Sequence, residues 1–240
     1  NYIFTHTSNK FEIDQKYFTW EYSGRVMFNY KFAELLNLLP RLPEEPITQD
    51  HKDLAAALQK IYEDKFEKLL ITAKNISKSP NIVLGGGCAY NGVANVLGYK
   101  YFRGVYVPFA PSDAGSAIGA CLYNYLGKRK DNSSPYLGNK YTNGECYEIM
   151  QKYKSQVKGR RFFKKEKLAY QVAKLIDQQN IVAWFQGSME FGARALGNRS
   201  ILASPRDASM RDKLNRVIKK REGFRPFAPS VTAETASRWF

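Results

Sequence analysis

The 240-residue sequence predicts an α/β fold in which helices alternate with short buried strands. A stretch that begins near residue 50 repeats apolar residues at the spacing of a helix. A short aliphatic run at residues 81–84 has the composition of a buried strand and leads into three consecutive glycines. The same order of amphipathic helix and aliphatic strand returns over residues 165–185. The length is sufficient for one large domain or two modest ones.

The first half of the chain opens without a long period. Residues 1–47 are rich in aromatic residues and contain three prolines, which predicts short elements and loops. Asp50 can cap a helix whose apolar stripe runs to Leu70. The elements expected after this helix are a strand over 81–84, a helix from about residue 91, a strand near 104–108 and a helix over 114–125.

The second half is separated from the first by the best linker in the sequence. Residues 127–143 carry a Lys-Arg-Lys run and then Ser, Pro, Gly and Asn without periodicity. Beyond them we expect an amphipathic helix over 165–179 and a buried strand over 181–185. The expected organisation is one domain over 1–126, a connecting segment over 127–160 and a second domain over 161–240.

Composition excludes several classes of protein. Hydrophobic residues make up 44% of the chain and aromatic residues 14%, so disorder of the whole chain is excluded. No apolar run approaches the roughly 18 residues of a membrane-spanning helix, and no membrane partner is expected. Three cysteines at unrelated spacings argue against a disulfide framework and against a paired-cysteine metal site. A cytoplasmic location is therefore expected.

Charge is distributed unevenly along the chain. The net charge is +15, of which residues 1–150 contribute +2 and residues 151–240 contribute +13. A nearly neutral part joined to a strongly basic part predicts that the second part faces anionic groups, such as the phosphates of a small molecule or of a nucleic acid. A solvated basic surface is the alternative interpretation.

The first motif is the glycine-rich segment at residues 84–91, Leu-Gly-Gly-Gly-Cys-Ala-Tyr-Asn. A strand that ends in consecutive glycines lets the backbone approach a nucleotide or a phosphate closely, because no Cβ intervenes. The segment lacks the lysine of a P-loop and the spacing of a dinucleotide fingerprint. A tight turn between a strand and a helix is the alternative.

The second motif, residues 108–120, places small residues on one face of the expected helix. Gly115 and Gly119 are four residues apart, so that this face can pack closely against backbone or ligand. Asp113 stands at the helix start, where an N-cap is its expected role and a hard-oxygen metal ligand the alternative.

The third and fourth motifs, residues 186–206 and 215–229, are rich in arginine. Their arginines are interleaved with glycines and apolar residues, which predicts a partly enclosed anion pocket rather than a solubilising surface. Glu190 could orient one of these arginines by an ion pair, which would also serve a purely structural purpose.

Histidines and cysteines offer little catalytic chemistry. His6 and His51 are far apart and lack zinc-type spacing. Cys88 and Cys121 have small or apolar neighbours in the sequence, which favours buried inert thiols over a Cys-His nucleophile pair.

Taken together, the motifs resemble a known family. The strings GSMEFGARALGNRSILASPRD and LNRVIKKREGFRPFAPSV closely resemble the signature of the O-carbamoyltransferase family of the NodU and CmcH type. The upstream strings HKDLAAALQ, LGGGCAYNGVAN and PSDAGSAIGA match the same family in the same order. The resemblance implies the second half of an actin/Hsp70/sugar-kinase-like (ASKHA) domain, followed by the first part of a YrdC-like α/β domain.

The resemblance also implies an activity. Members of the family use carbamoyl phosphate and ATP to form carbamoyl-adenylate in the YrdC-like domain. The large domain then passes the carbamoyl group to a hydroxyl-bearing small molecule with the help of a bound divalent metal ion. The expected metal is iron as Fe²⁺, with Mg²⁺ as the alternative.

The family's functional residues can be carried onto matching positions of this sequence. The resemblance implies that a phosphate clamp for carbamoyl phosphate and ATP is formed by Arg194, Lys219 and Arg225. It implies cofactor contacts at Gly86, Gly87, Asn91, Gly115 and Arg199, and a metal ligand at Asp113.

Two departures from the family bear on these expectations. The family's paired-histidine metal motif has no match at His6 or His51. We therefore expect a middle-to-late piece of a longer enzyme, which needs N- and C-terminal parts as partners, is inactive by itself, and is compatible with a homodimer. Cys88 and Tyr90 also replace aliphatic residues that are usual in the glycine-rich segment.

Two other functions remain open from the sequence. One is a tRNA-modifying relative of the threonylcarbamoyl-transferring type. The other is a non-catalytic module that binds anions or nucleic acid. Nucleic acid is not expected as a partner, because residues 186–230 contain only three aromatic residues, each next to glycine or proline.

Overall fold

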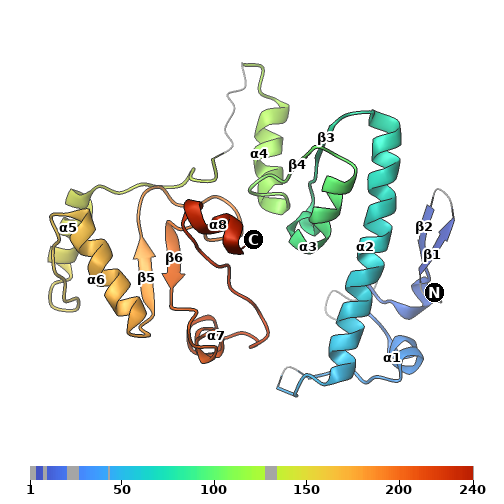
Figure 1. Cartoon of the computed structure of the whole chain (residues 1–240), viewed down its shortest axis with the longest axis horizontal. Coiled ribbons are helices and arrows are strands. Elements are labelled where there is room, and N and C mark those ends of the chain that lie inside the picture. The colour runs from blue at the N-terminus through green and yellow to red at the C-terminus, as the bar shows by residue number, and fades with distance from the viewer. Residues whose placement is uncertain (1–3, 8–9, 21–26, 43, 128–133, 240) are drawn as a thin grey trace. The chain divides into compact units, whose positions relative to one another are not determined.

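The computed structural model describes residues 4–7, 10–20, 27–42, 44–127 and 134–239, and side chains from residue 12 onward (Figure 1). Packing divides the chain into two compact units. The first unit consists of Asn1–Ile82 and Gly92–Val105, and the second of Val83–Asn91 and Tyr106–Phe240. These units cut the chain at other positions than the domain boundary expected at residue 126, so that boundary stays a prediction.

The first unit is organised by one long helix. Its elements are β1 (Phe4–Thr7), β2 (Lys10–Ile13), η1 (Gln15–Tyr17), α1 (Tyr30–Leu36), α2 (Gln49–Ser77), β3 (Asn81–Val83, with Val83 already in the second unit), α3 (Gly92–Asn95), η3 (Val96–Lys100) and β4 (Gly104–Tyr106, with Tyr106 in the second unit). Strands β1 and β2 form an antiparallel hairpin, and β3 pairs with β4.

Helix α2 begins one residue before the expected cap. Thr48 occupies the N-cap position, its backbone N–H donates to His51 Nδ1 at 3.2 Å, and its Oγ1 lies 2.6 Å from the same nitrogen. Asp50 therefore lies in the first turn and does not cap the helix. His51 takes the position that glutamate holds in a capping box, which gives this histidine a structural role.

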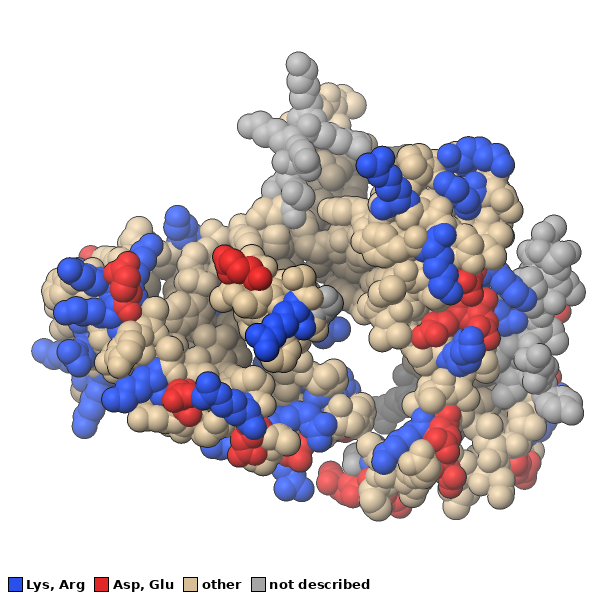
Figure 2. All heavy atoms as spheres, viewed as in Figure 1, with Lys and Arg blue, Asp and Glu red and all other residues tan. Residues whose placement is uncertain are grey.

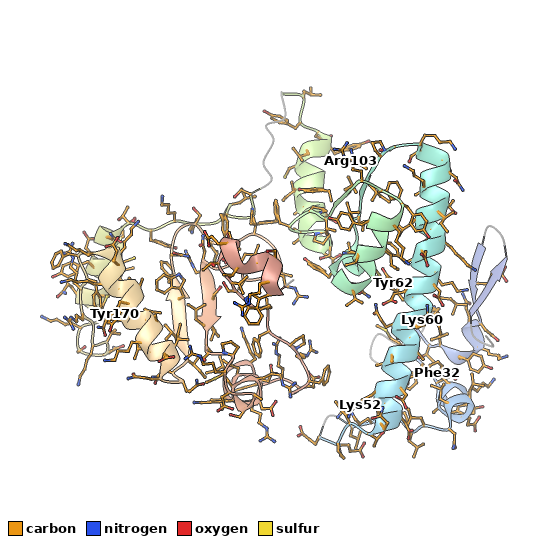
Figure 3. The ribbon with its side chains drawn as sticks, in the orientation of Figure 1. Phe32, Lys52, Lys60, Tyr62, Arg103 and Tyr170 are labelled. Atoms are coloured by element: carbon orange, nitrogen blue, oxygen red, sulfur yellow. The ribbon has the colours of Figure 1, made fainter. Side chains whose placement is uncertain are left out.

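The core of the first unit lies where α2 packs against α3 and η3. Leu70 is 1% exposed, and Ala94 and Phe102 are also buried. Glu67 on α2 accepts hydrogen bonds from Tyr101 Oη at 2.8 Å and from Lys100 Nζ at 3.1 Å. Nearer the start of α2, Figure 3 shows the side chains of Lys60 and Tyr62. Lys60 is paired with Asp64 at 2.6 Å, and the Tyr62 ring stacks on Phe66.

The second unit carries the four motifs. Its elements are η2 (Gly87–Tyr90), α4 (Asp113–Tyr123), α5 (Asn143–Lys152), α6 (Lys165–Asp177), β5 (Val182–Phe185), β6 (Arg199–Leu202), α7 (Ser209–Lys213), the π-helical turn η4 (Leu214–Lys219), η5 (Ala233–Thr235) and α8 (Ala236–Trp239). Strands β5 and β6 are antiparallel, with Phe185 opposite Arg199, and α6 packs against β5 (Figure 1).

The mixed helix and strand composition confirms the expected α/β class, and most of the expected elements form. The helix expected from about residue 91 forms as α3, which begins at Gly92 and continues as the 3-10 helix η3; Gly92 and Gly98 disfavour a longer regular α-helix. The β1–β2 hairpin, α5 and β6 were not expected. Strand β6 lies inside the arginine-rich motif and is stabilised by its pairing with β5, which sequence periodicity does not reveal.

Basic side chains are prominent in the second half of the chain. On the face that Figure 2 shows, Lys and Arg side chains gather over α5 and α6 and are interrupted by few acidic side chains. Every helix among the described residues is too short or too polar to span a membrane.

Candidate functional site

The glycine-rich segment forms an open turn at the end of β3. The Leu84 N–H donates to the Tyr106 carbonyl at 2.9 Å and extends the strand pairing up to the glycines. Gly86 has a φ of +85°, which favours glycine, and its N–H donates to the Pro111 carbonyl at 2.6 Å. Gly85, Gly86 and Gly87 are exposed, and a Cβ at any of them would meet no atom within 4 Å. A ligand can therefore approach this backbone closely.

Gly115 has a different role from the open glycines. A Cβ on Gly115 would overlap the carbonyl oxygen of Ala110, so that helix α4 begins directly against the preceding turn. Its N–H donates to the Ser112 carbonyl at 2.8 Å. The absence of a side chain at Gly115 thus serves packing within the chain.

Asp113 is the first residue of α4, and Ser112 takes the N-cap position. The expectation that Asp113 caps the helix is therefore wrong by one position. Its carboxylate is exposed. Across the described ranges, no group of three or more His, Cys, Asp or Glu side chains could hold a metal ion. The described side chains do not by themselves fit a metal site around Asp113, and no chemical step is derived through a metal.

The arginine-rich loop at 186–199 is wrapped around the carboxylate of Glu190. Its Oε1 accepts backbone N–H groups from Leu196 at 2.7 Å, from Asn198 at 2.8 Å and from Arg199 at 3.3 Å. Partial desolvation raises the pKa of the Glu190 carboxyl, but the hydrogen bonds from these backbone N–H groups together lower it by more. The resulting pKa is about 2. The expected ion pair between Glu190 and an arginine is therefore wrong. The Glu190 carboxylate instead binds backbone N–H groups of the loop.

The depressed pKa of Glu190 predicts how its contribution depends on pH. We expect Glu190→Gln to lower the free energy of unfolding by about 2 kcal/mol at pH 7, because hydrogen bonds to a charged acceptor weaken. The folded-state pKa is below the ordinary value of 4.5, so the stabilisation is complete above that value. It is lost as the pH falls toward about 2. Urea unfolding of both proteins across this range measures the effect, and a difference that did not change with pH would contradict it.

The two arginines of this loop are held in different ways. The Arg199 guanidinium donates to the carbonyls of Gln186, Asn198, Asn139 and Gly187, and lies 3.7 Å from the centre of the Phe185 ring. The Arg194 guanidinium donates to no protein acceptor among the described residues, and lies 5.3 Å from the centre of the Tyr90 ring. Arg199 therefore stabilises the loop, whereas the hydrogen-bond donors of Arg194 are available to a ligand.

Part of the expected linker belongs to this loop. The Gly138 N–H donates to the Met189 carbonyl at 2.8 Å, and the Phe191 N–H donates to the Pro135 carbonyl at 2.7 Å. Tyr136 Oη donates to the Leu196 carbonyl at 2.8 Å. Residues 128–133 of the expected linker lie outside the described residues. The segment 135–139 is thus a structural part of the arginine-rich loop.

The loop also packs against the segment that precedes α4. The Phe191 ring meets the Phe109 ring edge-on with centroids 6.3 Å apart. Gly192 has a φ of +115°, and a Cβ there would lie 3.2 Å from the Phe109 carbonyl oxygen. Together with the Gly86–Pro111 bond and the Tyr90–Arg194 contact, this brings the first three motifs together in one compact unit.

The fourth motif is organised by Asn215, which is fully buried. Its Nδ2 donates to the carbonyls of Gly223 and Arg225, at 3.2 and 2.9 Å, and its Oδ1 accepts from Arg221 Nε at 2.8 Å. Arg225 Nε donates to Glu222 at 2.7 Å. Lys219 ends the π-helical turn with an exposed side chain that has no hydrogen-bond or ion-pair partner among the described residues.

The structure thus brings together only some of the expected site residues. Gly86, Gly87 and Arg194 belong to the cluster of the first three motifs. Asn91 is the C-cap of η2, and its N–H donates to the Cys88 carbonyl at 3.0 Å. Lys219 and Arg225 belong to the separate fourth motif. The sequence pattern indicated no role for Tyr90, for Asn215 or for the segment 135–139. The aromatic residue at position 90 was the only visible signal among them.

The cysteine expectation is wrong in one respect. Cys88 and Cys121 are exposed, and Cys146 is half-buried. Cys88 follows the three exposed glycines and Cys121 lies on α4, so apolar sequence neighbours did not lead to burial of either thiol. Cys88 can therefore report on ligands at the glycine-rich turn.

A shallow hollow of about 410 Å³ lies at the start of α6, away from the motifs. Figure 3 shows Tyr170 on this helix. The hollow is lined by Arg160, Phe162, Glu166, Lys167, Tyr170 and Gln171.

Comparison with known proteins relates the motifs to a family. The Carbamoyltransferase N-terminus family matches residues 2–122, and the Carbamoyltransferase C-terminus family matches residues 173–240. The chain is 39% identical over 241 residues to the uncharacterized protein sll1178 of Synechocystis, which covers 96% of this chain and 39% of that protein. It is 38% identical over 203 residues to the nodulation protein NolNO of Sinorhizobium fredii, which covers 81% and 29% of the two chains.

A third relative has an enzymatic name. The chain is 30% identical over 191 residues to the 3'-hydroxymethylcephem-O-carbamoyltransferase of Amycolatopsis lactamdurans, which covers 78% of this chain and 35% of that enzyme. The chain thus spans 29–39% of the length of these relatives. Because the N-terminal family alone matches half of the sequence, the chain belongs to the carbamoyltransferase family, a family of transferase enzymes.

Proposed function

We propose that the chain takes part in an O-carbamoyl transfer, in which carbamoyl phosphate and ATP yield carbamoyl-adenylate and the carbamoyl group passes to a substrate hydroxyl. The family membership and the enzymatic name of the Amycolatopsis relative support this proposal. In this proposal, residues 2–122 form the second half of an ASKHA-like domain, and residues 173–240 form the start of a YrdC-like domain. The substrate is a small molecule that bears a hydroxyl group.

One observation supports the proposal most strongly: an arginine with available donors stands beside an open glycine turn. Arg194 has no protein acceptor among the described residues, and its guanidinium lies over Tyr90, three residues after Gly87. Arginine binds phosphate oxygens through two parallel hydrogen bonds, and exposed glycine backbone allows close approach. The pair of features suits a ligand that carries phosphate, such as ATP or carbamoyl phosphate.

The other expected residues enter the proposal with different weight. Gly86, Gly87 and Asn91 line the proposed nucleotide side of the site. Lys219 supplies a second cation with a free amine, whereas Arg225 must release or share Glu222 to bind phosphate. We assign Arg199 and Gly115 to positioning rather than to cofactor contact, because carbonyl groups already occupy the donors of Arg199 and the space beside Gly115.

The remaining expectations concern the metal ion, the cellular location and the oligomeric state. In this proposal the intact enzyme binds a divalent ion, Fe²⁺ or Mg²⁺. Asp113 would be the contribution of this chain, and further ligands would come from other parts of the enzyme. We likewise propose a cytoplasmic location and leave a homodimer open.

Calorimetric titration of the chain with carbamoyl phosphate and, separately, with ATP tests the proposal. We expect saturable binding that Arg194→Ala weakens by about 10- to 100-fold, because hydrogen bonds to charged groups contribute about 1.5–3 kcal/mol. The matched control is Arg206→Ala, because Arg206 belongs to the same motif but is exposed and already paired with Asp177. A folded chain that binds neither ligand, or binds both regardless of Arg194, would contradict the proposal.

Thiol alkylation gives a second readout at the glycine turn. Cys88 and Cys121 are both exposed, but only Cys88 adjoins the glycines. Bound ATP should slow the alkylation of Cys88 by iodoacetamide and leave Cys121 unchanged. Equal protection of both thiols would indicate a general change of conformation instead of a site at this turn.

The nucleic-acid alternative is favoured by one feature, the hollow on α6, which combines Arg160 and Lys167 with the rings of Phe162 and Tyr170. A tRNA-modifying relative or a non-catalytic module would bind single-stranded RNA there with affinity that falls steeply with salt. Such binding without any affinity for carbamoyl phosphate or ATP would favour this alternative.

A further inference from the structure

Arg194 is held at the candidate site by an aromatic ring from a distant segment. Its guanidinium carbon lies 5.3 Å from the centroid of the Tyr90 ring, within the range of a cation–π contact. Such a contact orients the guanidinium and leaves its N–H donors unused. This differs from Arg199, which also lies over a ring but donates to four backbone carbonyls.

The hydroxyl of Tyr90 contributes nothing to this arrangement. Tyr90 Oη is buried and has no hydrogen-bond partner in the described part of the chain. A buried hydroxyl without a partner is unfavourable for folding. The ring and the hydroxyl therefore have separable roles, and the ring alone accounts for the contact with Arg194.

The position of Tyr90 relates the arginine to the glycine turn. Tyr90 is the last residue of η2, which starts at Gly87, and Gly86 is anchored through its N–H to the Pro111 carbonyl at 2.6 Å. The turn is thus fixed to the segment before α4, and the ring at its end fixes the guanidinium. One ligand can therefore contact both the exposed glycine backbone and the free guanidinium of Arg194.

We infer that Tyr90 is a positioning residue, whose ring orients Arg194 for a phosphoryl group bound between the arginine and the glycine turn. The inference rests on the proposed function and extends it to a residue that lies outside the expected site. The ligand class is a phosphoryl anion, either the phosphate chain of a nucleoside triphosphate or an acyl phosphate. Because Tyr90 lies in the matched region 2–122 and Arg194 in 173–240, both matched regions are needed for this site.

Substitutions at Tyr90 in the full chain test the inference by calorimetric titration with ATP, carbamoyl phosphate and inorganic phosphate. We expect Tyr90→Leu to weaken binding by about threefold to tenfold, in line with the loss of a cation–π contact. Tyr90→Phe keeps the ring and is expected to bind like the wild type. Its melting temperature should not be lower, because it removes the unpartnered hydroxyl. The ligand whose affinity depends on the ring identifies the phosphoryl source.

A double-mutant cycle separates positioning from a purely structural effect. If Tyr90 acts through Arg194, then Tyr90→Leu has no further effect on binding in an Arg194→Ala chain. Equal losses with and without Arg194, or wild-type affinity in Tyr90→Leu, would overturn the inference and leave the proposed function intact. Absence of binding by the wild-type chain would overturn both.

Discussion

Replacing Gly115 by alanine is expected to lower the free energy of unfolding by about 3 kcal/mol. A Cβ at this position would overlap the carbonyl oxygen of Ala110, which belongs to the backbone and cannot rotate away as a side chain could. Relief of the overlap requires the start of α4 to move from the preceding turn. Gly86 is hydrogen-bonded to Pro111 in that turn, and Gly192 lies close to the Phe109 carbonyl, so the displacement should reach the candidate site.

Gly119→Ala is the matched control, because it lies one helical turn later in the same helix. A Cβ there would meet nothing within 4 Å, and alanine is favoured over glycine in a helix by about 0.5–1 kcal/mol. We therefore expect the two identical substitutions to shift the urea midpoint in opposite directions. If Gly115 instead served only as a cofactor contact, Gly115→Ala would keep wild-type stability and lose ATP affinity.

Asn215→Ala is expected to lower the free energy of unfolding by a similar amount, about 3 kcal/mol. The substitution removes three side-chain hydrogen bonds from a fully buried position. It leaves the carbonyls of Gly223 and Arg225 without their donor, and each hydrogen bond that is lost contributes about 0.5–1.5 kcal/mol. Arg221 also loses the acceptor of its Nε, which would free the loop that carries Arg225.

Urea unfolding of Asn215→Ala and of Asn124→Ala measures this effect. Asn124 is the C-cap of α4 and has an exposed side chain, and the same substitution there should change stability by no more than about 0.5 kcal/mol. Equal midpoints for the two variants would contradict the prediction, since they would mean that water satisfies the released groups in Asn215→Ala.

Local sequence patterns were sufficient to predict the longer elements. The helices α2, α4 and α6 and the strands β3 and β5 follow from apolar spacing and from their flanking prolines and glycines, because these signals act over a few residues. Strand β6 has no such signal, since its residues Arg199–Leu202 become a strand through pairing with β5. The caps at Thr48 and Ser112 were displaced from the expected positions by one or two residues, which is the usual uncertainty at helix ends.

The chemical character of the site was also visible in the sequence, but the assignment of roles was not. Arginines among glycines predicted an anion pocket, and the order of the motifs resembled one family, whose models match the chain. Which arginine has free donors depends on the carbonyls that surround it, and those of Arg199 come partly from Asn139, sixty residues earlier.

The sequence by itself determined the α/β class, the family and the basic character of the second half, because these depend on composition, local periodicity and the order of motifs. Only the tertiary structure decided that Glu190 binds backbone instead of an arginine, that Gly115 serves packing, and that Tyr90 meets Arg194. Each of these depends on atoms that are distant in the chain or on the direction in which a side chain points. Hydrogen bonds and close contacts act over a few ångströms, so their partners are determined by the fold and not by sequence spacing.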